Sequence, residues 1–200
     1  MTYKYNTSYK TYTGPTAYVG KSAGYEKLVV YWLGTTIYDL NLEFLRNFIS
    51  KMSRTHDQMH QAARSGKQCI VEGALALSVE SNLKLTSVSR ASYGELLEDY
   101  LDYLREKELT RWVKDDSRVI SIRREKDLPN KTYKSYKTYT TYMKNPESFV
   151  NLMITLCYKQ GYLLDQLLRA LQAKFIQEGG FRENLFKKRS EYRQKNFYRT

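Results

Sequence analysis

Four long stretches of the sequence repeat apolar residues every three or four positions, which is the spacing of one face of a helix. They cover residues 23–53, 56–78, 82–107 and 146–178. The last is the most sharply bounded, because Asn145-Pro146 is typical of a helix start and Gly179-Gly180 of a helix end. No convincing pair of strand-like segments accompanies them. The sequence therefore predicts an all-α fold, an up-and-down four-helix bundle.

The predicted bundle spans residues 23–180 and is flanked by segments of different composition. Residues 1–22, rich in tyrosine, threonine and lysine, are expected to form a flexible arm, and residues 181–200 a basic C-terminal tail. The helical pattern is lost before the last helix, so residues 113–144 are predicted to be a long, flexible, basic, low-complexity linker. In support, YKTYT occurs at residues 9–13 and again at 136–140, and tyrosine recurs at every third position between Tyr133 and Tyr142.

The positive charge is large and unevenly distributed. The chain has a formal net charge of +12, and residues 117–200 hold 18 basic against seven acidic side chains. Residues 56–116, in contrast, hold more acidic than basic side chains. This asymmetry favours a polyanionic partner, most often RNA or DNA.

Lysine and arginine neutralise phosphates, and tyrosine rings stack on unpaired bases. The predicted nucleic-acid contacts therefore lie in the second helix, the linker and the tail: Arg64, Lys67, Arg118, Arg123, Arg124, Lys126, Lys131, Lys134, Lys137, Lys187, Lys188, Arg189 and Arg193. The alternative for the linker is a solvated segment whose repeats have no binding role.

The stretch QAARSGKQCIVEG, residues 61–73, contains the Gly-Lys pair of a phosphate-binding loop. That loop needs G-x-x-x-x-G-K-[ST], but Gln61 replaces its first glycine and Gln68 its hydroxyl residue. A helix with one narrow side fits better. The residues predicted to pack or to make structural contacts there are Ala62, Ala63, Gly66, Gly73 and Glu72, the last through a buried polar contact.

A catalytic centre is not evident, so we expect a non-enzymatic protein without cofactor or metal. HDQMH, residues 56–60, places two histidines one turn apart as in zinc proteases, but Asp57 stands where the glutamate is needed. A metal-dependent hydrolase at His56 and His60 is the weakest alternative. Cys69 and Cys157 lack paired C-x-x-C spacing and are predicted to be reduced, buried thiols.

The first residues, MTYKYNTSYK, contain no apolar run typical of a secretory signal. No segment approaches the ~18 apolar residues that a membrane span needs. A cytoplasmic protein without membrane association is expected.

Three runs carry a family resemblance: DQMHQAARSGKQCIVEG, SRASYGELLEDYLDYLREKELTRW and NLMITLCYKQGYLLDQLLRALQAKFIQEGGF. They resemble a bacterial family of four-helix-bundle proteins with a C-terminal suffix domain, over residues 25 to 193 or so. The first three helices are also similar to proteins encoded in intervening sequences of 23S ribosomal RNA genes, a group that includes the accessory protein of diversity-generating retroelements. Cys69 stands where the family pattern has asparagine, and His56 and His60 fall in or beside variable positions.

The resemblance implies a helical bundle that assembles as a homopentamer. It also implies a link to nucleic acid, because the retroelement accessory protein binds nucleic acid and a reverse transcriptase. The basic charge and the resemblance together favour a homo-oligomeric protein that binds RNA or DNA through basic surfaces. A scaffold or adaptor that binds a protein partner is the alternative.

Overall fold

The computed structural model describes residues 24–126 and 138–197, and these residues form helices and connecting turns with no strand among them. The prediction of an all-α chain is confirmed for this part. The elements are η1 (Gly24–Lys27), α1 (Val29–Phe48), α2 (Arg54–Leu75), α3 (Val79–Glu106), α4 (Ser117–Arg124), η3 (Tyr142–Lys144), α5 (Pro146–Glu178) and α6 (Phe181–Phe197).

The helix boundaries follow local capping chemistry. The Asn145 side chain accepts a hydrogen bond from the Ser148 N–H at 2.8 Å, and Pro146 occupies the first turn of α5. At the other end, Gly179 has a φ of 73°, a backbone conformation that glycine adopts without strain. Ser53 and Ser78 cap α2 and α3 in the same way as Asn145. The predicted start and end of α5 are confirmed.

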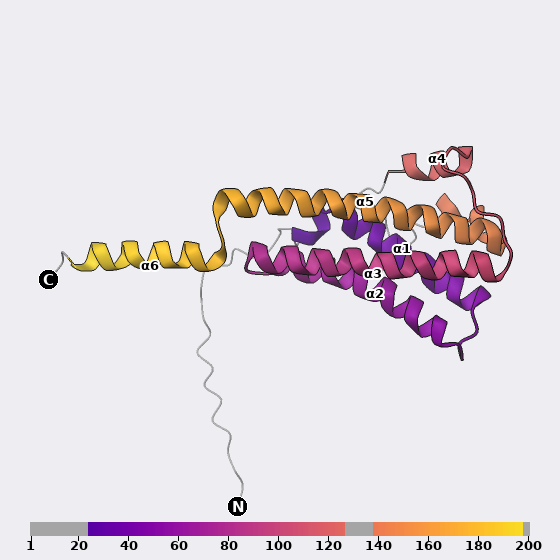
Figure 1. Cartoon of the computed structure of the whole chain (residues 1–200), viewed down its shortest axis with the longest axis horizontal. Helices are drawn as coiled ribbons and strands as arrows, with labels where there is room; N and C mark the ends of the chain where they lie inside the picture. Colours follow the sequence, from indigo (N-terminus) through magenta and orange to yellow (C-terminus); the bar gives the residue numbers. More distant parts are fainter. Residues whose placement is uncertain (1–23, 127–137, 198–200) are drawn as a thin grey trace, which may run out of the picture.

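Four helices, α1, α2, α3 and α5, pack side by side around one core, and successive members run in opposite directions (Figure 1). Phe44 of α1 is fully buried at the end of the core where α1 and α3 end and α5 begins. Its ring meets those of Tyr100, Tyr103 and Phe149 edge-to-face, with centroids 5.0 to 5.4 Å apart. Each such buried aromatic ring stabilises the fold by about 1.5–3 kcal/mol through removal of apolar surface from water.

Tyr93 of α3 is inserted between α1 and α2, and two glycines make room for it. A Cβ atom at Gly34 of α1 would lie 2.5 Å from the Tyr93 hydroxyl oxygen. A Cβ atom at Gly66 of α2 would lie 2.8 to 3.0 Å from three carbons of the Tyr93 ring. Ser89 of α3 donates a hydrogen bond to the Gly66 carbonyl at 2.7 Å. The two glycines therefore permit a helix approach that alanine would obstruct.

The narrow side of α2 is buried as a whole, since Ala62, Ala63, Gly66 and Gly73 are all inaccessible. Glu72 differs from the expectation: it is exposed, so the predicted buried polar contact is wrong. Each step along an α-helix turns the side chain by about 100°, so the residue before the inward-facing Gly73 lies on a different face.

The segment between α3 and α5 also differs from the expectation of a linker without regular structure. It contains α4, whose Val119 and Ile122 are buried, and the described residue Tyr139 is buried as well. Asp116 caps this helix by accepting from the Arg118 N–H at 2.8 Å. Two buried positions in eight residues are too few to produce a recognisable helical repeat. The predicted contacts Lys131, Lys134 and Lys137 lie outside the described residues.

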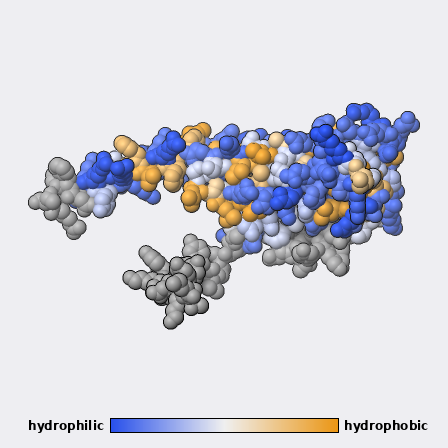
Figure 2. Space-filling view, turned by 90° about the horizontal axis from the view of Figure 1, so that it is seen from below, coloured by the Kyte–Doolittle hydropathy of each residue, from blue (hydrophilic) through white to orange (hydrophobic). Residues whose placement is uncertain are grey.

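The basic tail forms a helix, α6, which extends away from the packed helices (Figure 1). Its start is held by α3, because the Phe181 N–H donates to the Glu80 carboxylate at 3.0 Å. Figure 2 shows hydrophobic residues gathered on the half of the molecule nearer α6 and on α6 itself, whereas hydrophilic residues dominate the farther end. No helix in the described part of the chain combines the length and the apolar character needed to cross a membrane.

Candidate nucleic-acid interface

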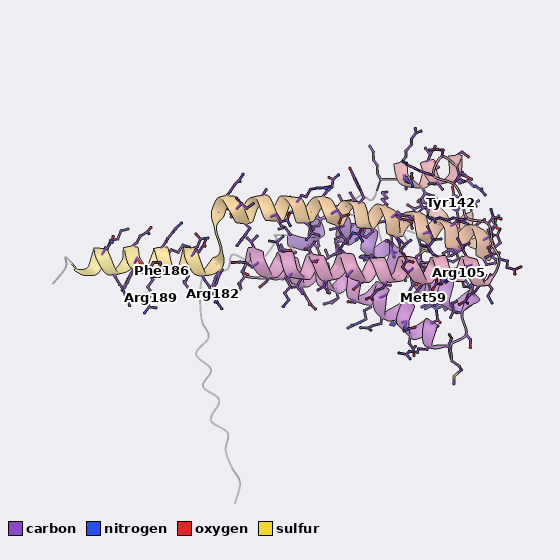
Figure 3. All side chains as sticks on the ribbon, in the orientation of Figure 1. Met59, Arg105, Tyr142, Arg182, Phe186 and Arg189 are labelled. Carbon is purple, nitrogen blue, oxygen red and sulfur yellow. The ribbon has the colours of Figure 1, made fainter. Side chains whose placement is uncertain are left out.

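The predicted basic contacts that the structure describes occupy three separate places. Arg64 and Lys67 lie in the middle of α2, a second group lies on or beside α4, and a third lies along α6. Figure 3 labels Tyr142 near α4, and Arg182, Phe186 and Arg189 on α6 at the opposite end of the molecule. One chain therefore does not bring these groups together into a continuous basic surface.

Of the three groups, Arg64 and Lys67 of α2 are the least suited to bind a phosphate. Arg64 is exposed, but Lys67 is half-buried with its ammonium nitrogen 4.7 Å from the centre of the Tyr38 ring. Burial raises the pKa of Asp39, and the nearby positive charge of Lys67 offsets part of that rise. Its charge is thus already engaged by α1.

A hollow between α2 and α3 is predominantly acidic. It has a volume of about 830 Å³, and its lining includes Asp57, Glu95, Glu98 and Asp99. Burial, with repulsion from Asp102 and Glu95, raises the pKa of Asp99 to about 6. Carboxylates crowded in this way repel phosphates, so this side of the molecule does not favour nucleic acid.

The α6 group is fully solvent-facing. The predicted contacts there are all exposed: Lys187, Lys188, Arg189 and Arg193. None of them forms a salt bridge with a residue that the structure describes. The Glu183 carboxylate instead accepts from the Gly180 N–H at 3.0 Å, at the start of the helix. Four cations on one projecting helix are therefore available to a polyanion.

The group on and beside α4 lies at a groove between α4 and α5, which we call the α4–α5 groove. It consists of two adjoining hollows of about 560 and 490 Å³ that share Lys114, Arg123 and Tyr158. The larger hollow also includes Arg111 and Trp112, and the smaller one Lys159 and Tyr162. No acidic side chain is among the described residues that line either hollow. The groove is therefore basic and aromatic.

The wall of the groove is positioned by Asn151 of α5. The Asn151 side-chain oxygen accepts a hydrogen bond from the backbone N–H of Trp112 at 2.8 Å. The Asn151 side-chain nitrogen donates to the backbone carbonyl of Thr110 at 2.9 Å. Lys159 adds a hydrogen bond from its ammonium group to the Glu125 carbonyl at 2.6 Å. The backbone on both sides of α4 is thus fastened to α5.

Arg118, a predicted nucleic-acid contact, instead contacts Trp112 and Asp116 of this chain. Its guanidinium carbon lies 3.9 Å from the centre of the Trp112 ring, and its nitrogens donate to both oxygens of Asp116 at 3.0 and 2.7 Å. These hydrogen bonds lower the pKa of Asp116 to about 2. Of the other contacts predicted in this part of the sequence, Arg123 lines the groove, while Arg124 at the end of α4 and Lys126 just after it are exposed.

Two polar features belong to the wall of the groove. Arg111 donates a hydrogen bond to the Tyr158 hydroxyl at 2.9 Å, which joins a cation to an exposed ring. The indole N–H of Trp112 is buried and has no hydrogen-bond partner among the described residues. The several cations of the groove suit a ligand with negatively charged oxygens.

The histidine and cysteine positions form no comparable site. His60 lies 3.5 Å from the Tyr38 hydroxyl, and His56 lies 3.4 Å from the neighbouring Asp57. In residues 24–126 and 138–197, no group of three His, Cys, Asp or Glu side chains could hold a metal ion. Cys69 and Cys157 are free and buried as predicted, and burial raises the pKa of the Cys157 thiol.

The other basic and tyrosine side chains of the groove were not predicted from the sequence: Arg111, Lys114, Tyr158, Lys159 and Tyr162. One signal was present in the sequence. Tyr158 and Tyr162 are one helical turn apart in α5 with Lys159 between them, and they interrupt its apolar pattern with exposed rings. Their proximity to Lys114, however, arises only from the packing of α4 on α5.

Comparisons with known proteins add no assignment to these surfaces. The family resemblance carried by the three sequence runs therefore stays a prediction. No protein-family model, no curated protein and no solved structure matches the chain.

Proposed function

We propose that the protein is a non-enzymatic, homo-oligomeric, cytoplasmic helical-bundle protein that binds nucleic acid through basic surfaces. The observation that supports this most directly is α6, which extends from the packed helices and exposes Lys187, Lys188, Arg189 and Arg193. Side chains of this kind, free of ion pairs with described residues, neutralise phosphates and release the counterions bound to them. The net charge of +12 adds a long-range attraction to the same partner.

The proposed unit of assembly is an up-and-down four-helix bundle formed by α1, α2, α3 and α5. The resemblance noted above suggests a pentamer. Exposed apolar side chains support self-association: Leu75 is 59% exposed, Leu77 92% and Phe186 72%. In an oligomer, several copies of α6 would act on one nucleic acid and raise the overall affinity.

The test measures binding of fluorescent RNA and DNA oligonucleotides by anisotropy between about 50 and 200 mM salt. A variant with Lys187, Lys188, Arg189 and Arg193 changed to Gln removes four charges from α6. Its matched control changes four exposed basic residues elsewhere to Gln, namely Lys51, Arg54, Lys84 and Lys107.

We expect the α6 variant to bind much more weakly and to lose about 3 units of the salt slope, since each phosphate contact contributes about 0.7–0.9. The control variant should lose little. Equal behaviour of the two variants, or no binding by the unmodified protein at low salt, would refute the proposal.

A scaffold or adaptor function is the second candidate, and the same exposed apolar residues favour it. Leu77, Phe186 and Tyr192, which is 71% exposed, are available to a protein partner. A pull-down from lysate with and without nuclease separates the two functions. A protein partner retained after nuclease treatment, in the absence of direct oligonucleotide binding, would favour the scaffold.

A further inference from the structure

We propose that the α4–α5 groove binds single-stranded nucleic acid, with unpaired bases stacked on Tyr158 and Tyr162 and phosphates held by Lys114 and Arg123. The inference rests on the proposed nucleic-acid binding and adds the form of nucleic acid that is recognised. In this arrangement α6 supplies general attraction to phosphates, and the groove supplies the preference for an unpaired strand.

The two rings are presented in a geometry that suits unpaired bases. Tyr158 is 43% exposed and Tyr162 60% exposed, and both belong to the rigid helix α5. Residues four apart are separated by about 6 Å along a helix axis, whereas bases stacked in a duplex are only about 3.4 Å apart. Each ring can therefore accept one base that has left its neighbour. The paired bases of a duplex do not offer a free face to such rings.

The cations lie where the strand backbone would pass. Lys114 and Arg123 line both hollows, as Tyr158 does, so a phosphate between two stacked bases would lie near them. Arg111 also lines the larger hollow and donates a hydrogen bond to the Tyr158 hydroxyl. Each hollow, at about 560 and 490 Å³, falls within the size range of small-ligand sites.

Trp112 forms part of the wall of the larger hollow. Its indole nitrogen is enclosed and has no hydrogen-bond partner among the described residues. A buried donor without a partner is destabilising. Because this nitrogen is enclosed, a ligand oxygen could accept its hydrogen bond only if the indole turned toward the hollow, so the two rings and the cations remain the main binding groups.

The experiment uses the full chain with a fluorescent 15-nucleotide single strand and a 15-base-pair duplex of matched sequence. Tyr158→Ala combined with Tyr162→Ala removes both rings, and Tyr158→Phe combined with Tyr162→Phe retains them. Because both side chains are exposed, neither variant removes a core residue, and the melting temperature checks that both are folded.

Loss of a base–aromatic stack typically weakens binding about 5- to 150-fold. We therefore expect the Ala variant to bind the single strand at least about 30-fold more weakly. Its duplex affinity and its salt slope should stay unchanged, because no charge is removed. The Phe variant should remain within about threefold of the unmodified protein. Changing Lys114 and Arg123 to Gln should lower the salt slope for the single strand by about 1.4.

Other results would overturn the inference and leave the proposed function standing. An Ala variant that keeps its single-strand affinity, or that loses single-strand and duplex affinity equally, shows that the rings do not recognise unpaired bases. Salt-sensitive binding that still depends on α6 would in that case support the proposed function alone. If the unmodified protein binds neither oligonucleotide, both proposals fail.

Discussion

Substitution of the two glycines that face Tyr93 tests the packing of α1, α2 and α3 directly. Tyr93 is 1% exposed, so its ring cannot move into solvent to make room. The Cβ atom of Gly66→Ala would lie 2.8 Å from a ring carbon, and the Cβ atom of Gly34→Ala would lie 2.5 Å from the hydroxyl oxygen. The two substitutions therefore press on different parts of one side chain.

The expected magnitude is the balance of two terms. Alanine in place of glycine stabilises a helix by about 1 kcal/mol. Overpacking a rigid core costs about 1–3 kcal/mol, and at a separation below 3 Å we expect the upper half of that range. Gly66→Ala should thus lower the free energy of unfolding by about 1–2 kcal/mol. For a chain of this size each kcal/mol corresponds to a Tm change of about 2–4 °C.

Gly94→Ala is the matched control, since this glycine is also helical and its added Cβ would find only the Arg90 guanidinium, at 3.9 Å. We expect it to stabilise the protein by about 0.5–1 kcal/mol. Tyr93→Phe removes the hydroxyl that faces Gly34. This second change should rescue Gly34→Ala, whose next neighbours are at 3.4 Å or beyond, but not Gly66→Ala.

Urea unfolding of the single and double variants gives the coupling free energies. We expect about 1–2 kcal/mol between Tyr93→Phe and Gly34→Ala, and less than about 0.5 kcal/mol between Tyr93→Phe and Gly66→Ala. The reasoning is wrong if Gly66→Ala is as stable as Gly94→Ala, or if Tyr93→Phe rescues both glycine variants equally.

Three further predictions concern polar groups. Asn151→Ala leaves the backbone N–H of Trp112 unpaired, so we expect the free energy of unfolding to fall by about 2 kcal/mol and amide hydrogen exchange around α4 to become faster. Unchanged exchange contradicts this. Tyr100→Phe leaves the Asn41 side-chain oxygen buried without its donor and should cost about 1–3 kcal/mol in urea unfolding; a neutral result contradicts this. Ionised Asp99 destabilises the fold because its pKa is raised, so Asp99→Asn should add about 1 kcal/mol above pH 7, after allowance for its exposure, and nothing below about pH 4; a gain in Tm that does not vary with pH contradicts this.

The long helices could be predicted from the sequence because their signals are local. An apolar stripe identifies a helix without knowledge of its partner, and the capping residue Asn145 and the C-terminal Gly179 placed both ends of α5. α4 could not be predicted in this way, because an eight-residue helix with two buried side chains has no repeat to detect. Its existence depends on the surface of α5 against which Val119 and Ile122 pack.

In the candidate interface, too, the features that depend on local sequence could be predicted and those that depend on tertiary packing could not. The charges of α6 were evident from composition alone, since a solvent-facing lysine needs no neighbour to be recognised. The α4–α5 groove was not, because Lys114 and Tyr158 are distant in sequence and meet only through tertiary packing. The position of Glu72 was wrong for a different reason: a shift of one residue along α2 changes the face on which a side chain lies.

The projection of α6 has an electrostatic consequence for the whole molecule. Its 17 residues span about 25 Å, whereas the charges of a protein are screened over about 8 Å at physiological ionic strength. The far half of α6 therefore lies several screening lengths from the carboxylates clustered between α2 and α3. At this ionic strength, neutralising the carboxylates of the acidic hollow should therefore leave the attraction of the far half of α6 for phosphates nearly unchanged.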